Sequence, residues 1–368
     1  MSTICLAMVC KNEAEYVARA LRSARPFIDR WVVVDTGSTD GTQDIVRAEM
    51  QGIPGTLHER PWVNWAHNRT EAVRLGKESG AEFVLILDAD EKLLMPDSFD
   101  LALEPDKAYW VTIQYGSMHY ARPNILSVKH NWHYVGVTHE YLTPEPDQPP
   151  AVLLPIEIET HPVRTNKTPE KCQLDADLLL KALETEPENS RYVFYLAQSY
   201  RDSMQPEKAI EWYGKRASMG GWYEEVWYSL FQIGELKARS GSPDHEIIGA
   251  YLNAFDYNPR RAEALGALAR YLRQKQRYHS AVMFAERAVA TPMPDEKLFV
   301  ETSYYTWLNL DEFAVASFWV GRYAEAAKAC DKLLKVAPQP ERERVEKNRQ
   351  FSLDKLGAKA APQGPQGS

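Results

Sequence analysis

The first 90 residues alternate between short apolar runs and stretches with helical spacing. The apolar runs cover residues 4–10, 31–36 and 83–89, and the helical stretches cover residues 12–24, 41–50 and 68–80. This alternation predicts a parallel sheet wound with helices. Ligands of such sheets bind outside the carboxyl ends of the strands. We therefore expect a binding site where these apolar runs end.

The third apolar run ends in a group of carboxylates. Residues 83–87 read FVLIL, which predicts a strand that is buried on both faces, and Asp88, Asp90 and Glu91 follow it. Neighbouring like charges raise one another's pKa, so a bound cation would explain them. The alternative is a polar loop in which one Asp caps the next helix.

The other two runs also end in polar residues. Lys11, Asn12 and Glu13 follow the first run, and a segment from Asp35 to Asp40 follows the second. A carboxylate such as Asp35 can accept hydrogen bonds from a nucleobase or a ribose, and the small residues Gly37 and Ser38 let a ligand approach the backbone. The alternative is a turn and helix cap, with Thr42 facing solvent. Neither GxGxxG nor GxxxxGK[ST] is present, so a dinucleotide cofactor or an ATPase phosphate loop is not supported.

Composition and charge exclude several classes of protein. The chain has 368 residues, 44% hydrophobic content and a formal net charge of -8, which does not favour a protein that mainly grips nucleic acid. Its four cysteines lack zinc-ligand spacing and disulfide density, so we expect reduced thiols in the cytoplasm. No segment approaches the roughly 20 apolar residues that span a bilayer. We expect a soluble protein.

The character of the sequence changes twice beyond residue 105. Aromatic-rich segments at 108–116, 132–142 and 153–161 read as strands, and from about residue 170 the pattern is helical. Two helical segments repeat the same spacing of small and apolar residues: Leu196, Ala197, Tyr200, Ala209 and Tyr213, then Leu268, Ala269, Leu272, Ala281 and Ala285. These segments resemble tetratricopeptide (TPR) repeats. Their irregular spacing predicts an irregular all-α solenoid.

These patterns divide the chain into three parts. We expect an α/β domain over residues 1–165, a TPR-like helical domain over 166–340, and a charged helix end with a disordered tail over 341–368. The tail assignment rests on residues 357–368, which are rich in Gly, Pro and Gln.

Four motifs in the first part resemble a known family. CKNEA, VVVDTGSTDGT, NWAHNRTEA and LILDADE occur in this order and are similar to family 2 glycosyltransferases of the GT-A fold, a Rossmann-like nucleotide-diphospho-sugar transferase domain. The resemblance covers about the first 165 residues. It implies an inverting transfer of a sugar from a nucleotide sugar, with a UDP-sugar as the expected donor.

The resemblance also implies roles for individual residues. Asp35, with the neighbourhood of Asn12, Glu13, Gly37 and Ser38, would recognise the nucleotide, and Arg69 would lie near its base or phosphates. The DAD sequence of Asp88, Ala89 and Asp90 corresponds to the DxD motif of the family. In this motif Asp88 would face the ribose and the metal, and Asp90 would coordinate the divalent cation. Mg²⁺ or Mn²⁺ would stabilise the charge of the departing diphosphate.

The transfer also needs a base for the acceptor proton. The segment WHYVGVTHEYL resembles a W…HE segment of some relatives, so Glu140 is the candidate base and Glu91 its competitor. His139 is a candidate metal or phosphate contact, and His161 is a rival metal ligand. Either histidine has a structural role as its alternative.

Two other hypotheses remain open. The apolar run and DxD also resemble haloacid-dehalogenase-like phosphatases, in which Asp88 would be the nucleophile and Asp90 the acid and base. Alternatively the repeats are a protein-binding scaffold and the first domain is degenerate. The acceptor is open among glycan, peptide or protein, and nucleic acid, because a segment with Arg260, Arg261, Arg270, Arg273, Lys275 and Arg277 is basic. The repeats could also bind a protein partner or a second copy of the chain.

Overall fold

The chain forms two compact units. The computed structural model describes residues 2–96, 101–116, 118–160 and 168–360. One unit runs from Met1 to Tyr195 and the other from Leu196 to Ser368. The helical region already begins at Pro169, so the first unit contains the α/β sheet together with helix α4 and the start of α5.

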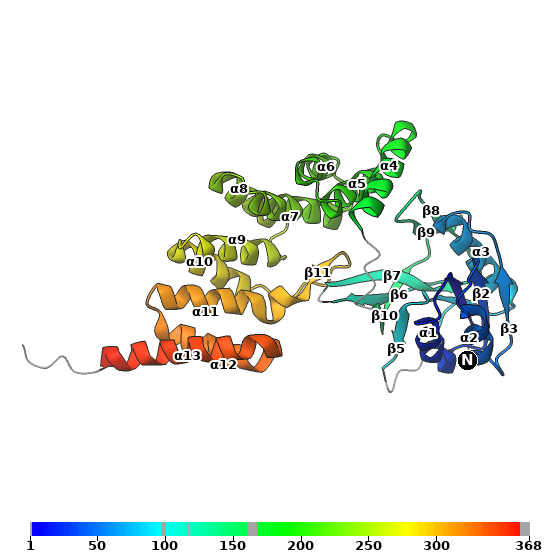
Figure 1. Ribbon diagram of the computed structural model, residues 1–368, viewed down its shortest axis with the longest axis horizontal. Coiled ribbons are helices and arrows are strands. Elements are labelled where there is room, and N and C mark those ends of the chain that lie inside the picture. The colour runs from blue at the N-terminus through cyan, green and yellow to red at the C-terminus, as the bar shows by residue number, and fades with distance from the viewer. Residues whose placement is uncertain (1, 97–100, 117, 161–167, 361–368) are drawn as a thin grey trace, which may run out of the picture. The chain divides into compact units, whose positions relative to one another are not determined.

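A mixed sheet forms the centre of the first unit (Figure 1). Its strands run in the order β3-β2-β1-β4-β7-β6-β10-β5. Strands β1 to β4 are parallel to one another, as predicted, whereas β7 is antiparallel to β4 and β6. The strands are β1 (Ile4–Cys10), β2 (Arg30–Asp35), β3 (Gly55–Glu59), β4 (Phe83–Ile86), β5 (Glu91–Leu94), β6 (Ala108–Tyr115), β7 (Met118–Ser127) and β10 (Ala151–Thr160). A separate hairpin pairs β8 (Asn131–Val135) with β9 (Tyr141–Glu145).

Helices cover both faces of this sheet. Alternate residues of β4 point into two different clusters of the core: Phe83 and Leu85 into one, Val84 and Ile86 into the other. The first cluster also contains side chains of α1 (Val17–Ala24) and α2 (Thr42–Glu49), and the second contains those of α3 (Trp65–Glu78). A short 3₁₀ turn at Arg25–Phe27 follows α1. The run at 83–87 is buried on both faces, which confirms the prediction.

The observed strands differ from the predicted ones at β3, β5 and β7, which were not predicted, and at residues 132–142. Strand β3 lies at the edge of the sheet, where a short run with polar side chains suffices, so its sequence gave no apolar signal. Strand β7 was missed because Pro123 and Asn124 interrupt its apolar pattern. The predicted strand at 132–142 is instead the hairpin of β8 and β9, with a turn that includes Gly136 at a φ of 125°.

The rest of the chain is helical, as predicted. Its helices are α4 (Pro169–Thr185), α5 (Ser190–Asp202), α6 (Pro206–Ser218), α7 (Tyr223–Arg239), α8 (Asp244–Tyr257), α9 (Glu263–Gln274), α10 (Tyr278–Val289), α11 (Asn309–Trp319), α12 (Tyr323–Val336) and α13 (Gln339–Ala360). From α6 onward each helix packs against the next one, which is the arrangement of a helical repeat array. Among the described residues, we find no helix that has both the length and the apolar character to cross a membrane.

The repeat positions form the interior of this array. Leu196, Ala197 and Ala209 are fully buried, and so are Leu268, Ala269 and Ala281. The long spacing between Ala281 and Ala326 has a structural cause, because an insertion separates α10 from α11. It contains a two-residue strand, β11 (Val300–Glu301), and a π-helical turn, Tyr304–Leu308.

Carboxylates neutralise the basic segment of the array. Arg261 is fully buried and contacts Glu263 and Glu296 at 2.7 and 3.0 Å. The other pairs in this segment are Arg260 with Glu296, Arg270 with Glu235, Arg273 with Glu312 and Lys275 with Asp244. Each of these five cations thus has a carboxylate partner, which reduces the positive charge that the segment offers to an anionic acceptor.

The C-terminal end is more helical than predicted. Helix α13 continues to Ala360, so residues 357–360, which we expected to be disordered, are helical. Residues 361–368 lie outside the described residues.

Candidate functional site

A buried carboxylate shapes the loop after β2. The Asp35 Oδ1 atom accepts hydrogen bonds from the backbone N–H groups of Gly37 and Ser38 at 3.0 and 2.9 Å, and from Gln43 Nε2 at 2.9 Å. Its Oδ2 atom accepts from the Ser38 hydroxyl. Burial opposes ionisation of Asp35, but these hydrogen bonds outweigh it and hold its pKa below the usual value. Asp35 is fully buried, so it orders the loop and presents no surface to a ligand in this conformation.

The ends of β1 and β2 meet, as predicted. Cys10 and Asp35 are register partners, and Asn12 then connects the two following loops. Its N–H donates to Ser38 Oγ at 2.9 Å, and its side-chain oxygen accepts from the Thr39 N–H at 2.8 Å. Asn12 holds a positive φ of 54°, a conformation that asparagine tolerates better than most residues.

Glu13 and Thr42 extend this connection. The Glu13 N–H donates to Thr42 Oγ1 at 2.8 Å, and the Thr42 hydroxyl donates to Asp40 Oδ1 at 2.6 Å. Thr42 is fully buried, so the alternative in which it faces solvent is wrong. The hydroxyl is buried because it links the start of α2 to the end of β1.

A chain of alternating charges lies beyond the end of β4. Arg69 on α3 donates to Asp88 Oδ2 at 2.7 Å and to Glu140 Oε1 at 2.9 Å. Arg122 on β7 donates to both oxygens of Glu91 at 2.7 Å and lies 3.8 Å from Asp88 Oδ2. The order is therefore Glu140, Arg69, Asp88, Arg122, Glu91, and the fold brings these five residues together from four segments: the turn between β8 and β9, α3, the stretch 88–91 after β4, and β7.

In the charge chain, burial raises the pKa of a carboxyl group and ion pairing lowers it, and the balance differs between Asp88 and Glu91. For Asp88, burial alone would raise the pKa, but the two guanidinium groups of Arg69 and Arg122 lower it below the usual value. For Glu91, burial dominates and raises the pKa despite the contact with Arg122. Asp88 is thus held as a carboxylate, whereas Glu91 depends on Arg122 for its charge.

Sequence analysis missed Arg122 and Asn124, which support the DxD segment. The pairing of β7 with β6 shifts at Asn124, so β7 has a bulge there. The Asn124 side chain donates to the Ile86 carbonyl at 2.9 Å and accepts from Arg122 Nε at 3.1 Å. A bulge beside a site re-aims a side chain, and here it places Arg122 against Asp88. The sequence offered no local signal for Arg122, because Pro123 and Asn124 interrupt the apolar pattern of its strand.

Three more of the predicted residues, Ala89, Asp90 and His139, are next to members of the charge chain in the sequence. Ala89 is buried, and the carbonyl of Asp90 accepts from Arg19 at 3.1 Å, which ties the DxD segment to α1. The His139 ring stacks on Tyr195 with centroids 4.2 Å apart, and its carbonyl accepts from Arg191 at 3.0 Å. His161 lies outside the described residues.

The donor set allows a divalent cation only with help from a substrate. Among the residues that the structure describes, no three His, Cys, Asp or Glu side chains gather into a group that could hold a metal ion. Both arginine contacts to Asp88 use Oδ2, so a cation at this motif would have to be held by Oδ1 of Asp88 together with Asp90. Mg²⁺ and Mn²⁺ accept such oxygens together with phosphate oxygens and water. The residues therefore fit a cation that arrives with a diphosphate.

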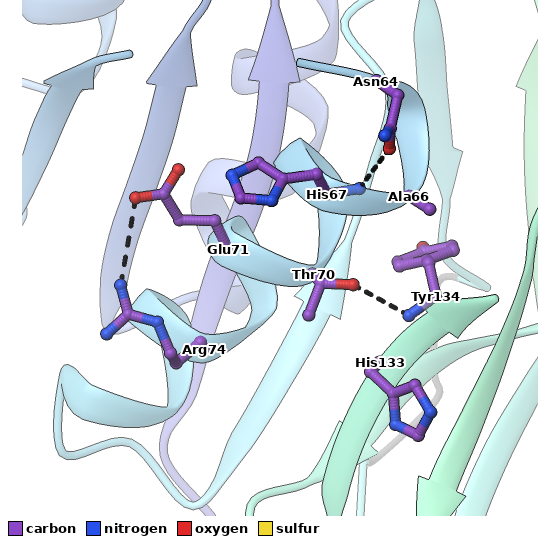
Figure 2. Close-up of a pocket in the computed structure, with 8 residues that line it drawn as sticks. All are labelled: Asn64, Ala66, His67, Thr70, Glu71, Arg74, His133 and Tyr134. Carbon is purple, nitrogen blue, oxygen red and sulfur yellow. Dashed lines mark hydrogen bonds and ion pairs between the residues drawn. The ribbon is translucent and has the colours of Figure 1, made fainter. Parts of the chain in front are cut away.

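A cleft lies between α3 and β8 (Figure 2). Its volume is about 540 Å³, and its wall includes His67, Thr70, Arg74, His133 and Tyr134. Thr70 Oγ1 accepts a hydrogen bond from the Tyr134 N–H at 2.9 Å, and this bond joins α3 to β8 within the cleft. None of the five residues of the charge chain lines the cleft, so we place the candidate site at the charge chain instead.

Comparison with known proteins identifies the segment that carries this site. Residues 5–162 match Glycosyl transferase family 2. The first unit therefore contains a family 2 glycosyltransferase domain, which confirms the resemblance drawn from the four motifs. All five residues of the charge chain lie within the matched range.

The similar curated proteins match only short stretches. An uncharacterized glycosyltransferase of Rickettsia felis is 34% identical over 93 residues, which is 25% of this chain and 30% of that protein. One of Rickettsia conorii is 36% identical over 86 residues, 23% of this chain and 28% of that protein. A TPR repeat-containing protein of Synechococcus elongatus is 30% identical over 111 residues, 29% of this chain and 25% of that protein. The chain thus spans less than a third of the length of these relatives.

Solved structures similar to this chain include TPR proteins. The C-terminal part of a TPR repeat-containing protein from Cytophaga hutchinsonii has a TM-score of 0.40 and 16% identity, over 53% of this chain and 71% of that chain. The successive packing of helices α6 to α13 by itself identifies the second unit as a helical repeat array.

Proposed function

We propose that this protein is a metal-dependent inverting glycosyltransferase that moves a sugar from a UDP-sugar to an acceptor. One observation carries the proposal: within a family 2 glycosyltransferase domain, Arg69 connects Asp88 of the DxD motif to the candidate base Glu140. The helical repeats would help to position the acceptor or a protein partner. The four cysteines are free thiols, which agrees with the cytoplasmic location that we include in the proposal.

The residues would divide the work of donor binding. The loops of Asn12 and Ser38 would bind the nucleotide, with Asp35 fixing their shape. Oδ1 of Asp88 and the carboxylate of Asp90 would hold Mg²⁺ or Mn²⁺, which supplies positive charge to the diphosphate. Arg69 would add a further positive charge at the same place.

Glu140 would act as the base in the transfer. A new bond forms between the acceptor oxygen and the anomeric carbon, while the bond from that carbon to the phosphate oxygen breaks and leaves its electron pair on the diphosphate. The acceptor proton passes to Glu140, whose Oε1 is held by Arg69, so Oε2 would receive it. Glu91 is buried and has both oxygens on Arg122, so we assign it a positioning role for Asp88.

The first experiment measures release of nucleoside diphosphate from a panel of nucleotide sugars, with Mn²⁺, Mg²⁺ or EDTA. The protein is compared with Asp90→Ala and with the control Asp44→Ala, whose side chain is exposed on α2. We expect metal-dependent release from one donor, lost in Asp90→Ala and kept in Asp44→Ala. Absence of release from every donor, together with absence of nucleotide binding by calorimetry, would sink the proposal and favour the scaffold hypothesis.

The base assignment has its own test. Glu140→Gln removes the proton acceptor, so we expect kcat to fall by about 100-fold or more with a smaller change in the KM for the donor. Glu71→Gln, on the same helix as Arg69 and paired with Arg60 at 2.7 Å, is the control for loss of a carboxylate. A kcat within about threefold of the wild type in Glu140→Gln would exclude Glu140 as the base.

The phosphatase hypothesis requires an Asp88 carboxylate that is free to attack. The Arg69 and Arg122 contacts hold this carboxylate, and the DxD segment follows the fourth strand rather than the first. We do not propose this activity.

A further inference from the structure

Two tryptophan side chains are exposed at the start of α3. Trp62 and Trp65 are 42% and 46% exposed, and Val63 between them is 53% exposed. The two indole rings meet edge to face, with centroids 4.8 Å apart and an interplanar angle of 83°. Large apolar side chains that gather in one exposed patch mark a binding surface more often than isolated ones do.

The backbone that carries these rings is firmly held. Asn68 is fully buried, and its side-chain amide donates to the Pro61 carbonyl at 3.2 Å while its oxygen accepts from the Val63 N–H at 3.0 Å. Asn64 caps α3, with its side-chain oxygen accepting from the His67 N–H at 2.8 Å. A buried amide is thus committed to fixing a segment that displays apolar rings to solvent. Such preorganisation lowers the entropic cost of binding a ligand.

The exposed rings adjoin the charge chain. The Arg69 guanidinium lies over the Trp65 ring, 5.1 Å from its centroid, and the same group contacts Glu140 and Asp88. The nucleotide loops at Asn12 and Ser38 belong to other strand ends. Trp65 is therefore linked to the proposed base through the Arg69 guanidinium, which contacts both.

We propose that Trp62 and Trp65 form a stacking platform for a sugar ring of a carbohydrate acceptor. The inference rests on the proposed function, because it takes Glu140 as the base that receives the acceptor proton. One face of a pyranose ring carries C–H groups, which pack on the electron-rich face of an indole. Because the two indoles are nearly perpendicular, one of them would offer its face to the sugar and the other would border the sugar as a side wall. A ring stacked there would direct its hydroxyl groups toward its rim, where Arg69 and Glu140 offer donors and acceptors. The platform selects a carbohydrate over a flexible polar chain that has no apolar face.

The test measures binding of methyl glycosides to the full chain by saturation-transfer NMR. The probes are the α- and β-methyl glycosides of glucose, galactose, mannose and N-acetylglucosamine, which carry no aromatic group of their own. We expect at least one probe to bind, and its affinity to fall about three- to tenfold in Trp62→Ala and in Trp65→Ala. Trp62→Phe keeps an aromatic face and should restore most of the affinity. Trp222→Ala, which removes a tryptophan of the same 42% exposure from the other unit, should bind like the wild type.

Each contrary result identifies a different error. Failure of all eight probes to bind, or equal binding by the wild type and the Trp62→Ala/Trp65→Ala double variant, overturns the platform. Loss of UDP or GDP binding in Trp62→Ala without loss of glycoside binding would assign the rings to a nucleobase and also overturn it. Folding of every variant is checked by circular dichroism, and a variant that does not fold is replaced by its Phe counterpart. Donor cleavage and nucleotide binding are measured in parallel. Glycoside binding that depends on Trp62, in a protein that neither cleaves a nucleotide sugar nor binds a nucleotide, supports the platform and refutes the transferase.

Discussion

Replacement of Arg122 by methionine tests whether the charge chain holds the DxD segment in place. The variant leaves the buried Glu91 carboxylate without its guanidinium partner, with the Asp88 N–H at 3.0 Å as a remaining donor. Two hydrogen bonds to a charged group are lost, each worth about 1.5–3 kcal/mol. About a quarter of the Arg122 side chain is exposed, so we discount the sum of the two hydrogen-bond energies. We expect the free energy of unfolding to fall by about 3 kcal/mol.

The loss should also depend on pH. Burial already raises the pKa of Glu91, and removal of Arg122 takes away the charge that opposes this rise. A carboxyl group whose pKa is raised in the folded state is least costly when it is protonated. The difference in the free energy of unfolding between the wild type and Arg122→Met should therefore become smaller as the pH falls from 7 to 5.

The assay is hydrogen exchange of peptides from β5 and β7, which reports local opening in a chain of two units. Arg74→Met, which removes an exposed pair with Glu78, is the control and should cost less than about 1 kcal/mol. The double variant Glu91→Gln/Arg122→Met should be about 1–2 kcal/mol more stable than the sum of the effects of Glu91→Gln alone and Arg122→Met alone. Additive losses, or a deficit that is the same at pH 5 and pH 7, would refute the reasoning.

Three further predictions concern other parts of the chain. A Cβ at Gly266 would overlap the side chains of Tyr304 and Asn309, so Gly266→Ala should lower the free energy of unfolding by about 1–3 kcal/mol. Gly249→Ala, in open space on α8, should raise it by about 0.5–1 kcal/mol, and thermal unfolding of the two variants measures the contrast. Arg261→Met removes the guanidinium partner of the buried Glu263 and leaves the buried Glu296 only its longer contact with the exposed Arg260, so it should lower the free energy of unfolding by about 3–5 kcal/mol. Arg260→Met should cost less than about 1 kcal/mol, and equal shifts in denaturation midpoint would contradict this contrast. Because the pKa of Asp35 is lowered in the folded state, its contribution to stability is present above the unfolded value of about 3.9 and is lost as the pH falls below it. Asp35→Asn should therefore lower stability at pH 7 and reduce its pH dependence below about pH 4, as acid titration of the two proteins would show.

Local sequence patterns predicted the parts of the fold whose signals are local. The run at 83–87 consists only of large apolar residues, and such a run is typical of a strand that is covered on both faces of its sheet. The carboxyl ends of β1 and β2 were expected to meet because parallel strands end at the same edge. The connection through Asn12 and Ser38 follows that expectation closely.

The parts that could not be predicted depend on contacts between distant segments. Arg122 reaches Asp88 only because a bulge at Asn124 reorients β7, and no local spacing encodes that pairing. Thr42 looked like a solvent-facing cap because its hydrogen-bond partner, the Glu13 N–H, lies 29 residues away. The exposure of Trp62 depends on a backbone that the side chain of Asn68 holds in place.

The charge chain also limits how this domain can diverge. Loss of Glu91 alone leaves Arg122 with an excess charge, and loss of Arg122 alone leaves Glu91 buried and unpaired. Accepted substitutions at the two positions should therefore occur together in related sequences, replacing the pair by two neutral residues in a single lineage. Arg69 joins two carboxylates and should be still harder to replace, since its loss requires compensation at both Asp88 and Glu140. A family alignment should consequently show correlated changes between β5 and β7, but near constancy at the Arg69 position of α3.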